Sequence, residues 1–212
     1  MVQILGFDAM EEHSIRQLMA QFHAGEHHLG ELMAIEKAHL PGYDGKVVPR
    51  RTGSGDGLEM TMYLSSCRPF TIAHELAHVS DIAVRRRESL ANLTCEMPSH
   101  WHLAYKMSSE YYANRIACGY ADGDDCFRAF RSDAAGLLST AGEKDWGSFL
   151  VYYALLLGVL HGIGRMELDP LKMVRPKAHI PVRVLKGMAH FRRQAEDFFD
   201  GYHLPRIAAA AA

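Results

Sequence analysis

The chain has 212 residues, of which 48% are hydrophobic and 23% are charged, and its formal net charge at pH 7 is -2. This length and composition predict one globular domain over residues 1–212 and exclude a disordered chain. The near-neutral charge gives no electrostatic reason to expect direct binding to nucleic acid or to an anionic membrane.

The N-terminal residues lead from Met1 into the acidic pair Glu11 and Glu12 without a basic stretch ahead of an apolar one. This order does not resemble a secretory signal, so the default expectation is a cytoplasmic protein. Residues 8–40 contain no proline and place apolar side chains at helical spacing. They therefore predict one or two N-terminal helices.

A loop and a strand are expected next. Residues 41–57 are rich in Pro, Gly, Asp and Ser, which predicts a mobile loop that could act as a lid. From Leu58 to Ser65 apolar and polar residues alternate, and this pattern predicts a half-buried strand.

The rest of the chain has mainly helical patterns. One helix is expected over 68–87, with Pro69 in the first turn, where proline is tolerated. The apolar run 149–160 is shorter than the ~20 residues of a membrane span, so it predicts a buried core helix. We expect an α+β protein that is mainly helical with a small β-sheet. Further helices are expected at about 103–121, 125–140, 147–162 and 183–200, so that C-terminal helices fill 125–200.

One short motif carries the chemistry. Residues 71–81 read Thr-Ile-Ala-His-Glu-Leu-Ala-His-Val-Ser-Asp and contain H-E-x-x-H. On a helix, His74 and His78 project from the same face, so both imidazoles can reach one ion at about 2.0–2.1 Å. Glu75 is placed to take a proton from a zinc-bound water, which then attacks an amide carbonyl. The alternative is an amphipathic helix whose two histidines are incidental.

A catalytic zinc ion needs a third protein ligand and an open fourth position. We favour Glu110, because it lies on a predicted helix far enough along the chain for a loop to bring it back. Asp81 continues the histidine stripe, but seven residues of helix span about 10.5 Å, too far for the same ion. Asp81 is expected either to contact the ligand side chains without binding the ion or to be a surface charge. The candidates considered are Asp81, Glu88, His100, His102 and Glu110.

Asn114 follows Glu110 by one helical turn on the same face. Its side-chain oxygen could accept the free N–H of a ligating histidine. The alternative for Asn114 is an ordinary exposed helix residue. The donor that would stabilise an oxyanion is left open among His161, His100, His102, Tyr111 and Tyr112.

Two stretches, Arg-Pro-Phe-Thr-Ile-Ala-His-Glu-Leu-Ala-His-Val and Glu-Tyr-Tyr-Ala-Asn-Arg-Ile-Ala, resemble the core motifs of the gluzincin metallopeptidases. More narrowly, they are similar to those of the small ImmA/IrrE-like peptidases of bacteria and their mobile elements. The resemblance covers about residues 57–122. It implies a minimal gluzincin core, one zinc ion per chain held by His74, His78 and Glu110, and Glu75 as the base.

The resemblance also implies a cytoplasmic protease that acts on specific regulatory proteins, often repressors. In zinc peptidases of this design, the edge strand beside the motif helix pairs with an extended substrate. The strand at 58–65 is expected to fill this role, with Met62 and Tyr63 contacting the substrate.

The function expected from the sequence is thus zinc-dependent cleavage of a peptide bond in a protein substrate. Two alternatives stay open. One is a zinc-binding regulatory or interaction protein that has the peptidase fold without turnover. The other is a toxin or effector protease that is exported to act on a host target.

Overall fold

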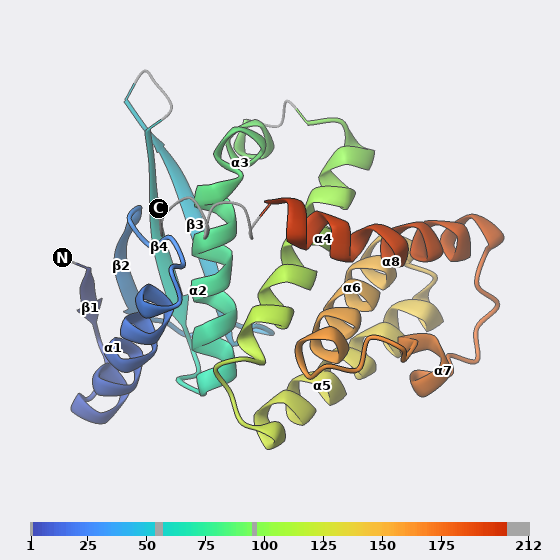
Figure 1. The fold of residues 1–212 in the computed structure, drawn as a ribbon, viewed down its shortest axis with the longest axis horizontal. Coiled ribbons are helices and arrows are strands. Elements are labelled where there is room, and N and C mark those ends of the chain that lie inside the picture. The colour runs from blue at the N-terminus through green and yellow to red at the C-terminus, as the bar shows by residue number, and fades with distance from the viewer. Residues whose placement is uncertain (1, 54–56, 95–96, 203–212) are drawn as a thin grey trace. The chain divides into compact units, whose positions relative to one another are not determined.

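The computed structural model of the chain describes residues 2–53, 57–94 and 97–202 (Figure 1). Over these residues the fold is α+β and mainly helical, with a small sheet, as the sequence predicts. Contacts within the chain define two compact units, Met1–His102 and Leu103–Ala212. The prediction of a single domain over residues 1–212 stays a prediction.

The first unit is built on a four-stranded sheet with the order β1-β2-β4-β3. β1 is parallel to β2 and β2 to β4, whereas β3 is antiparallel to β4. The elements are β1 (Gln3–Leu5), α1 (Ala9–Ala24), β2 (Leu32–Lys37), β3 (Gly45–Thr52), β4 (Gly57–Leu64), α2 (Pro69–Val84) and α3 (Arg86–Leu93).

Helix α1 begins with a capping box, in which the side chains of Asp8 and Glu11 each accept a hydrogen bond from the other residue's backbone N–H. The prediction of helices throughout residues 8–40 is wrong after α1, because β2 occupies part of that range. The sequence Leu-Met-Ala-Ile-Glu-Lys of β2 favours a helix by intrinsic propensity. Pairing with a strand on each side, and burial of Leu32 and Ile35, outweigh that preference.

Strand β4 confirms the alternating pattern read from the sequence. Its buried side chains lie on one face of the sheet, and they are Leu58, Met60, Met62 and Leu64. The expectation that this strand lies at an edge is wrong, because β4 pairs with β2 on one side and with β3 on the other.

One edge of the sheet is β1 and the other is β3, which lies within the segment 41–57 that the sequence predicts to be a loop. Residues 54–56 of that segment lie outside the described residues. Its glycines and Pro49 obscured a strand whose main positive signal was the pair Val47 and Val48. Proline is tolerated in an edge strand, where one side of the backbone has no ladder to complete. The lid interpretation is therefore wrong for the eight residues of β3.

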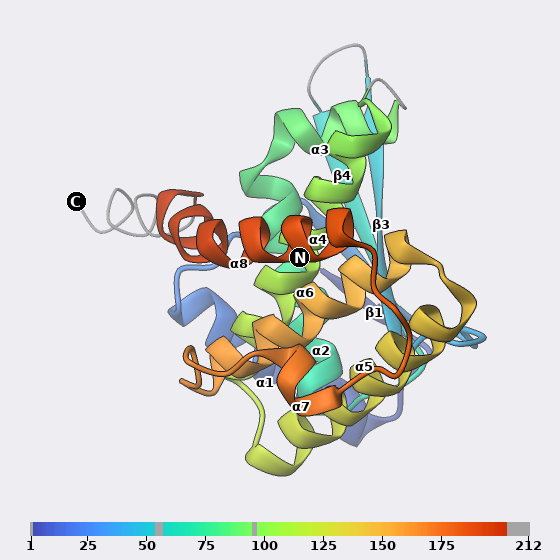
Figure 2. The ribbon, with the colours of Figure 1, turned by 90° about the vertical axis from the view of Figure 1, so that its right-hand side faces the viewer.

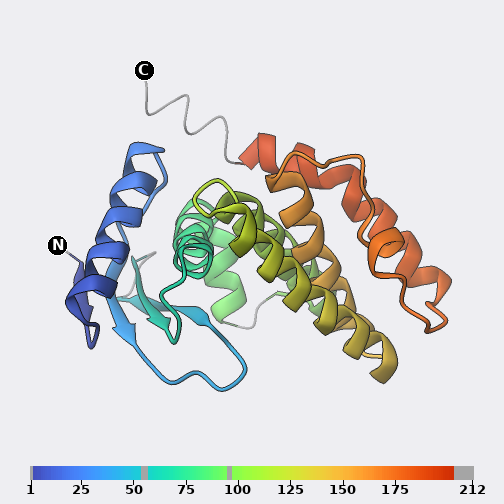
Figure 3. The ribbon, with the colours of Figure 1, turned by 90° about the horizontal axis from the view of Figure 1, so that it is seen from below.

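Helix α2 packs against β3 and β4 and against α1. In Figure 3, α1 and α2 lie on the same side of the sheet. Most of α2 is buried, since its apolar residues cover the inner face of the strands. The motif helix is thus fixed between the sheet and another helix.

The second unit is helical (Figure 2). The helices expected in this half of the chain are confirmed, with boundaries that differ by a few residues. Helix α6 packs against α5, α7 and α8 and is buried along most of its length, as its apolar sequence predicts. No helix of the described residues is long and apolar enough to cross a membrane. The helices are α4 (Ser99–Ala117), α5 (Gly123–Glu143), α6 (Trp146–Gly162), α7 (Pro170–Val174) and α8 (Val182–Tyr202).

Two glycines of α6 allow its backbone to approach that of α4 closely. A Cβ atom at Gly158 would lie 2.5 Å from the carbonyl oxygen of Tyr111, and one at Gly162 would lie 2.7 Å from that of Arg115. Any larger residue at either position would force the two helices apart. This contact sets the position of the α4 segment that carries Glu110.

Candidate metal centre

Helix α2 brings the two motif histidines together. Proline at position 69 begins the helix, and His74 and His78 follow one turn apart on it. Their Nε2 atoms lie 3.0 Å apart, and their rings are nearly perpendicular, at 84°. Two nitrogen ligands bound tetrahedrally to one ion at about 2.0–2.1 Å are separated by roughly 3.3–3.4 Å, slightly more than the distance here. The two imidazoles are therefore arranged as a pair of ligands to a single ion.

Glu110 completes a group that could hold a metal ion. The ligand atoms of His74, His78 and Glu110 all lie within 4.8 Å of one another, and all three residues are half-buried. The set of two histidines and one carboxylate fits the donors of a catalytic zinc centre. Among the described residues, the other candidates for the third ligand do not belong to this group. These are Asp81, Glu88, His100 and His102.

Glu75 lies next to the ligand His74 in α2 but is not a member of the ligand group. Its side chain is only 5% exposed. It is packed against Gly45, the first residue of β3. A carboxylate on the residue next to a ligand, and outside the ligand group, is a candidate for handling protons beside a metal ion.

Asp81 is fully buried, so its interpretation as a surface charge is wrong. The Nε atom of Arg85 donates to Asp81 Oδ1 at 2.8 Å, and a terminal nitrogen of Arg85 donates to Oδ2. No pattern in the sequence indicates that Arg85 is buried, because it begins a run of three arginines at a helix end. A support for the metal ligands by Asp81 stays a prediction.

Asn114 is also buried, which excludes its interpretation as an exposed helix residue. Its amide nitrogen donates to Asp133 Oδ2 and to the carbonyl oxygen of Leu155, both at 3.0 Å. These bonds connect α4 to α5 and α6. The hydrogen bond from a ligating histidine to the Asn114 oxygen stays a prediction.

The two residues expected to contact substrate have different environments. Met62 is fully buried on the inner face of the sheet, so its side chain cannot meet a bound peptide in this arrangement. Tyr63 points to the other face, where the Lys46 Nζ atom lies 5.2 Å from the centre of its ring. Both residues belong to an interior strand, whereas the expected substrate contacts rest on an edge strand. A substrate contact by Tyr63 stays a prediction.

Two of the candidates for an oxyanion donor bind each other. The hydroxyl of Tyr111 lies 2.7 Å from His161 Nδ1 and accepts a hydrogen bond of 2.8 Å from Arg115. Burial, together with the positive charges of Arg115 and Arg192, lowers the pKa of His161 to about 4. The imidazole is therefore neutral at pH 7, and the tyrosine hydroxyl donates to its Nδ1 atom. Both groups are buried parts of the second unit's interior.

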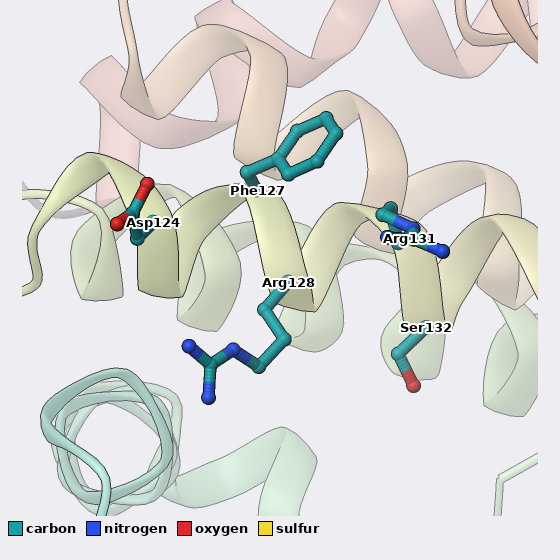
Figure 4. Close-up of a pocket in the computed structure, with 5 residues that line it drawn as sticks. All are labelled: Asp124, Phe127, Arg128, Arg131 and Ser132. Atoms are coloured by element: carbon teal, nitrogen blue, oxygen red, sulfur yellow. The ribbon is translucent and has the colours of Figure 1, made fainter.

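A separate hollow of about 470 Å³ lies on the exposed surface of α5 (Figure 4). Phe127 and Arg128 project from opposite sides of the helix. The guanidinium of Arg131 lies 6.0 Å from the ring of Phe127. None of the lining residues is a predicted site residue. They are Asp124, Phe127, Arg128, Arg131 and Ser132.

The chain was compared with protein-family models, with curated proteins and with solved structures. No family model, no curated protein and no solved structure matches it. The site is therefore interpreted from its own residues and geometry.

Proposed function

We propose that this protein is a zinc-dependent endopeptidase that hydrolyses a peptide bond in a protein substrate. The observation that carries the proposal is the group of His74, His78 and Glu110, whose ligand atoms lie within 4.8 Å of one another. Glu75 is adjacent to this group and outside it. A minimal gluzincin core of the ImmA/IrrE-like type is part of the same proposal.

Zinc is the proposed metal because two imidazoles and one carboxylate form a ligand set typical of catalytic zinc centres. When bound, the ion would polarise the carbonyl of the scissile bond and make a water molecule more acidic. The three side chains would hold the ion, and a catalytic centre of this kind keeps a further position open for water or substrate. One ion per chain is expected.

Glu75 is proposed as the general base. Its carboxylate would accept the proton of the attacking water and then deliver it to the nitrogen of the leaving amine. The carboxylate is nearly excluded from solvent, which strengthens its interactions with nearby charge. Replacing it with an amide removes the proton acceptor and leaves the ligand set intact.

We propose that β3, and not β4, is the strand of the sheet that pairs with the substrate. β3 ends the sheet among the described residues, and its first residue lies against Glu75. An extended peptide that adds to this edge would be held by backbone hydrogen bonds and would run past the base. The partner is then a protein or peptide with an accessible extended segment. A cytoplasmic regulatory protein is the class that we propose.

Metal analysis and turnover test the proposal together. Wild-type protein should contain one zinc ion per chain and should cleave peptides from a bacterial lysate digest, as followed by mass spectrometry. Glu110→Ala should lose the metal, whereas Glu75→Gln should retain it and lose cleavage. Glu88→Ala is the matched control, because this carboxylate lies outside the ligand group.

Three results would contradict the proposal in different ways. Zinc-free wild-type protein, prepared without chelators, would mean that the histidines are incidental. Zinc that is retained without any Glu75-dependent cleavage would favour the regulatory or interaction protein. Export and cleavage of a host protein would favour the toxin or effector protease.

A further inference from the structure

Gly45 lies in direct contact with the side chain of Glu75. A Cβ atom at Gly45 would lie 2.6 Å from Glu75 Cγ, 2.8 Å from Oε1 and 2.9 Å from Cδ. All three distances are below 3.0 Å, and real Cβ atoms essentially never approach another heavy atom more closely than that. The space that a side chain would need at Gly45 is therefore occupied by the carboxylate of Glu75.

Backbone conformation does not explain why this residue is glycine. A positive φ is the usual reason for glycine at a turn, and Gly45 is not among the glycines of the described residues that have one. It is an ordinary strand residue, paired with Leu64. The close approach of Glu75 is the feature of the structure that requires the missing side chain.

The start of β3 is anchored to the start of α2, so we expect a clash at Gly45 to displace the side chain of Glu75. The carbonyl oxygen of Asp44 accepts hydrogen bonds from the backbone N–H groups of Ser65, at 2.9 Å, and Ser66, at 3.2 Å. The carboxylate of Asp44 is also paired with Arg68, the residue that caps α2. These contacts fix the start of β3 against the start of the helix that carries Glu75.

We infer that Gly45 is a positioning residue, whose missing side chain leaves the space that the Glu75 carboxylate occupies at the start of β3. The inference rests on the proposed function for the role of Glu75 as a base. The three nearest atoms to the Cβ position all belong to Glu75, and none belongs to His74 or His78. Alanine at position 45 therefore displaces the base and leaves the ligands in place.

A double-mutant cycle on metal-free, full-length protein tests the contact without using activity. Glu75→Ala deletes Cγ, Cδ and both carboxylate oxygens, which include all three of the atoms that a Cβ at Gly45 would meet. Gly45→Ala should lower the urea midpoint of unfolding in the wild-type background and leave it nearly unchanged in the Glu75→Ala background. An equal loss in both backgrounds overturns the inference.

Gly57→Ala is the matched control for general damage to the sheet. Gly57 lies at the opposite end of the β3–β4 pair, and a Cβ there would lie 2.5 Å from the carbonyl oxygen of Thr52. Its effect on the midpoint should be the same in both backgrounds. If Gly45→Ala alone fails to fold, a folded Gly45→Ala/Glu75→Ala protein supports the inference and an unfolded one overturns it.

The second measurement separates positioning from metal binding. Zinc content of Gly45→Ala should equal that of wild type, while kcat on the lysate peptides should fall toward the value of Glu75→Gln with little change in KM. Wild-type kcat in Gly45→Ala would overturn the positioning role. A wild-type protein that binds zinc but cleaves nothing would overturn the proposed function, and the stability cycle would still test the contact.

Discussion

Arg85 and Asp81 form an ion pair that is almost entirely removed from water, with side chains 3% and 0% exposed. Both residues lie at the end of the motif helix α2. Desolvation of two charges is costly, and each charge is tolerated only because the other is present. The pair therefore makes the stability of this helix end sensitive to the loss of either partner.

Arg85→Met should destabilise the protein by about 3–5 kcal/mol, because it leaves the Asp81 carboxylate buried without its cation. Asp81→Leu/Arg85→Met should recover most of that loss. Urea unfolding followed by circular dichroism measures both. Arg87→Met is the control, since Arg87 is exposed, and a comparable loss there would contradict the role of burial.

Stability should fall at acid pH because of His161. The folded state lowers the pKa of this imidazole to about 4, whereas the unfolded chain protonates it near its ordinary value of about 6.5. The unfolded state therefore binds more protons between these values, and stability decreases as the pH falls below about 6.5. The loss attributable to His161 should be at most about 3 kcal/mol.

His161→Gln isolates this contribution. The difference in unfolding free energy between wild type and variant, measured in chelator from about pH 8 to about pH 4.5, should be constant above neutral pH. As the pH decreases, the unfolding free energy of the wild type should fall relative to that of the variant. A difference that stays the same at every pH would show that His161 does not titrate as its surroundings indicate.

Gly158→Ala should destabilise the second unit by about 1–3 kcal/mol, because the added methyl group would collide with the carbonyl oxygen of Tyr111. Gly142→Ala is a matched helical control, since a Cβ there meets nothing within 4 Å. It should stabilise by about 0.5–1 kcal/mol through the usual helix preference for alanine. Thermal melts of the two variants should move in opposite directions. Shifts of the melting temperature in the same direction for both variants would count against the close approach of α6 to α4.

Thr61→Pro should unfold the first unit, because Thr61 lies in a strand that is paired on both sides. Proline removes a ladder donor and is found in sheets essentially only on edge strands or at bulges. Thr61→Val keeps the branched shape and should be close to neutral. A folded Thr61→Pro protein with wild-type zinc content would argue against the interior position of β4.

The sequence predicted α2 and β4 well, because each has a strong local pattern. The residues of β2 misled the prediction, since helix-forming side chains there are overruled by strand pairing with distant segments. β3 was hidden by glycine and proline, which mark loops more often than edge strands. For Gly45, only the folded chain shows that the missing side chain lies beside Glu75.

The candidate site divides in the same way. The pairing of His74 with His78 follows from helical periodicity alone. Glu110 lies far enough along the chain for a loop to bring its helix back to the two histidines. The burial of Asp81, Arg85 and Asn114 depends on neighbours that no local pattern encodes. The expected edge position of β4 is wrong for a topological reason, since alternation identifies a strand but not its place in a sheet.

The interior position of β4 has a consequence for local opening of the protein. In the chain, β4 is followed by α2, the helix that carries both histidines. β4 is paired on both sides, whereas β3 is paired on one side only. Partial openings that release β3 need not disturb β4 or α2. In native-state hydrogen exchange, amides on the free side of β3 should exchange rapidly, while those of β4 and α2 stay protected until global unfolding. The sheet edge can thus open while the two histidines keep their spacing.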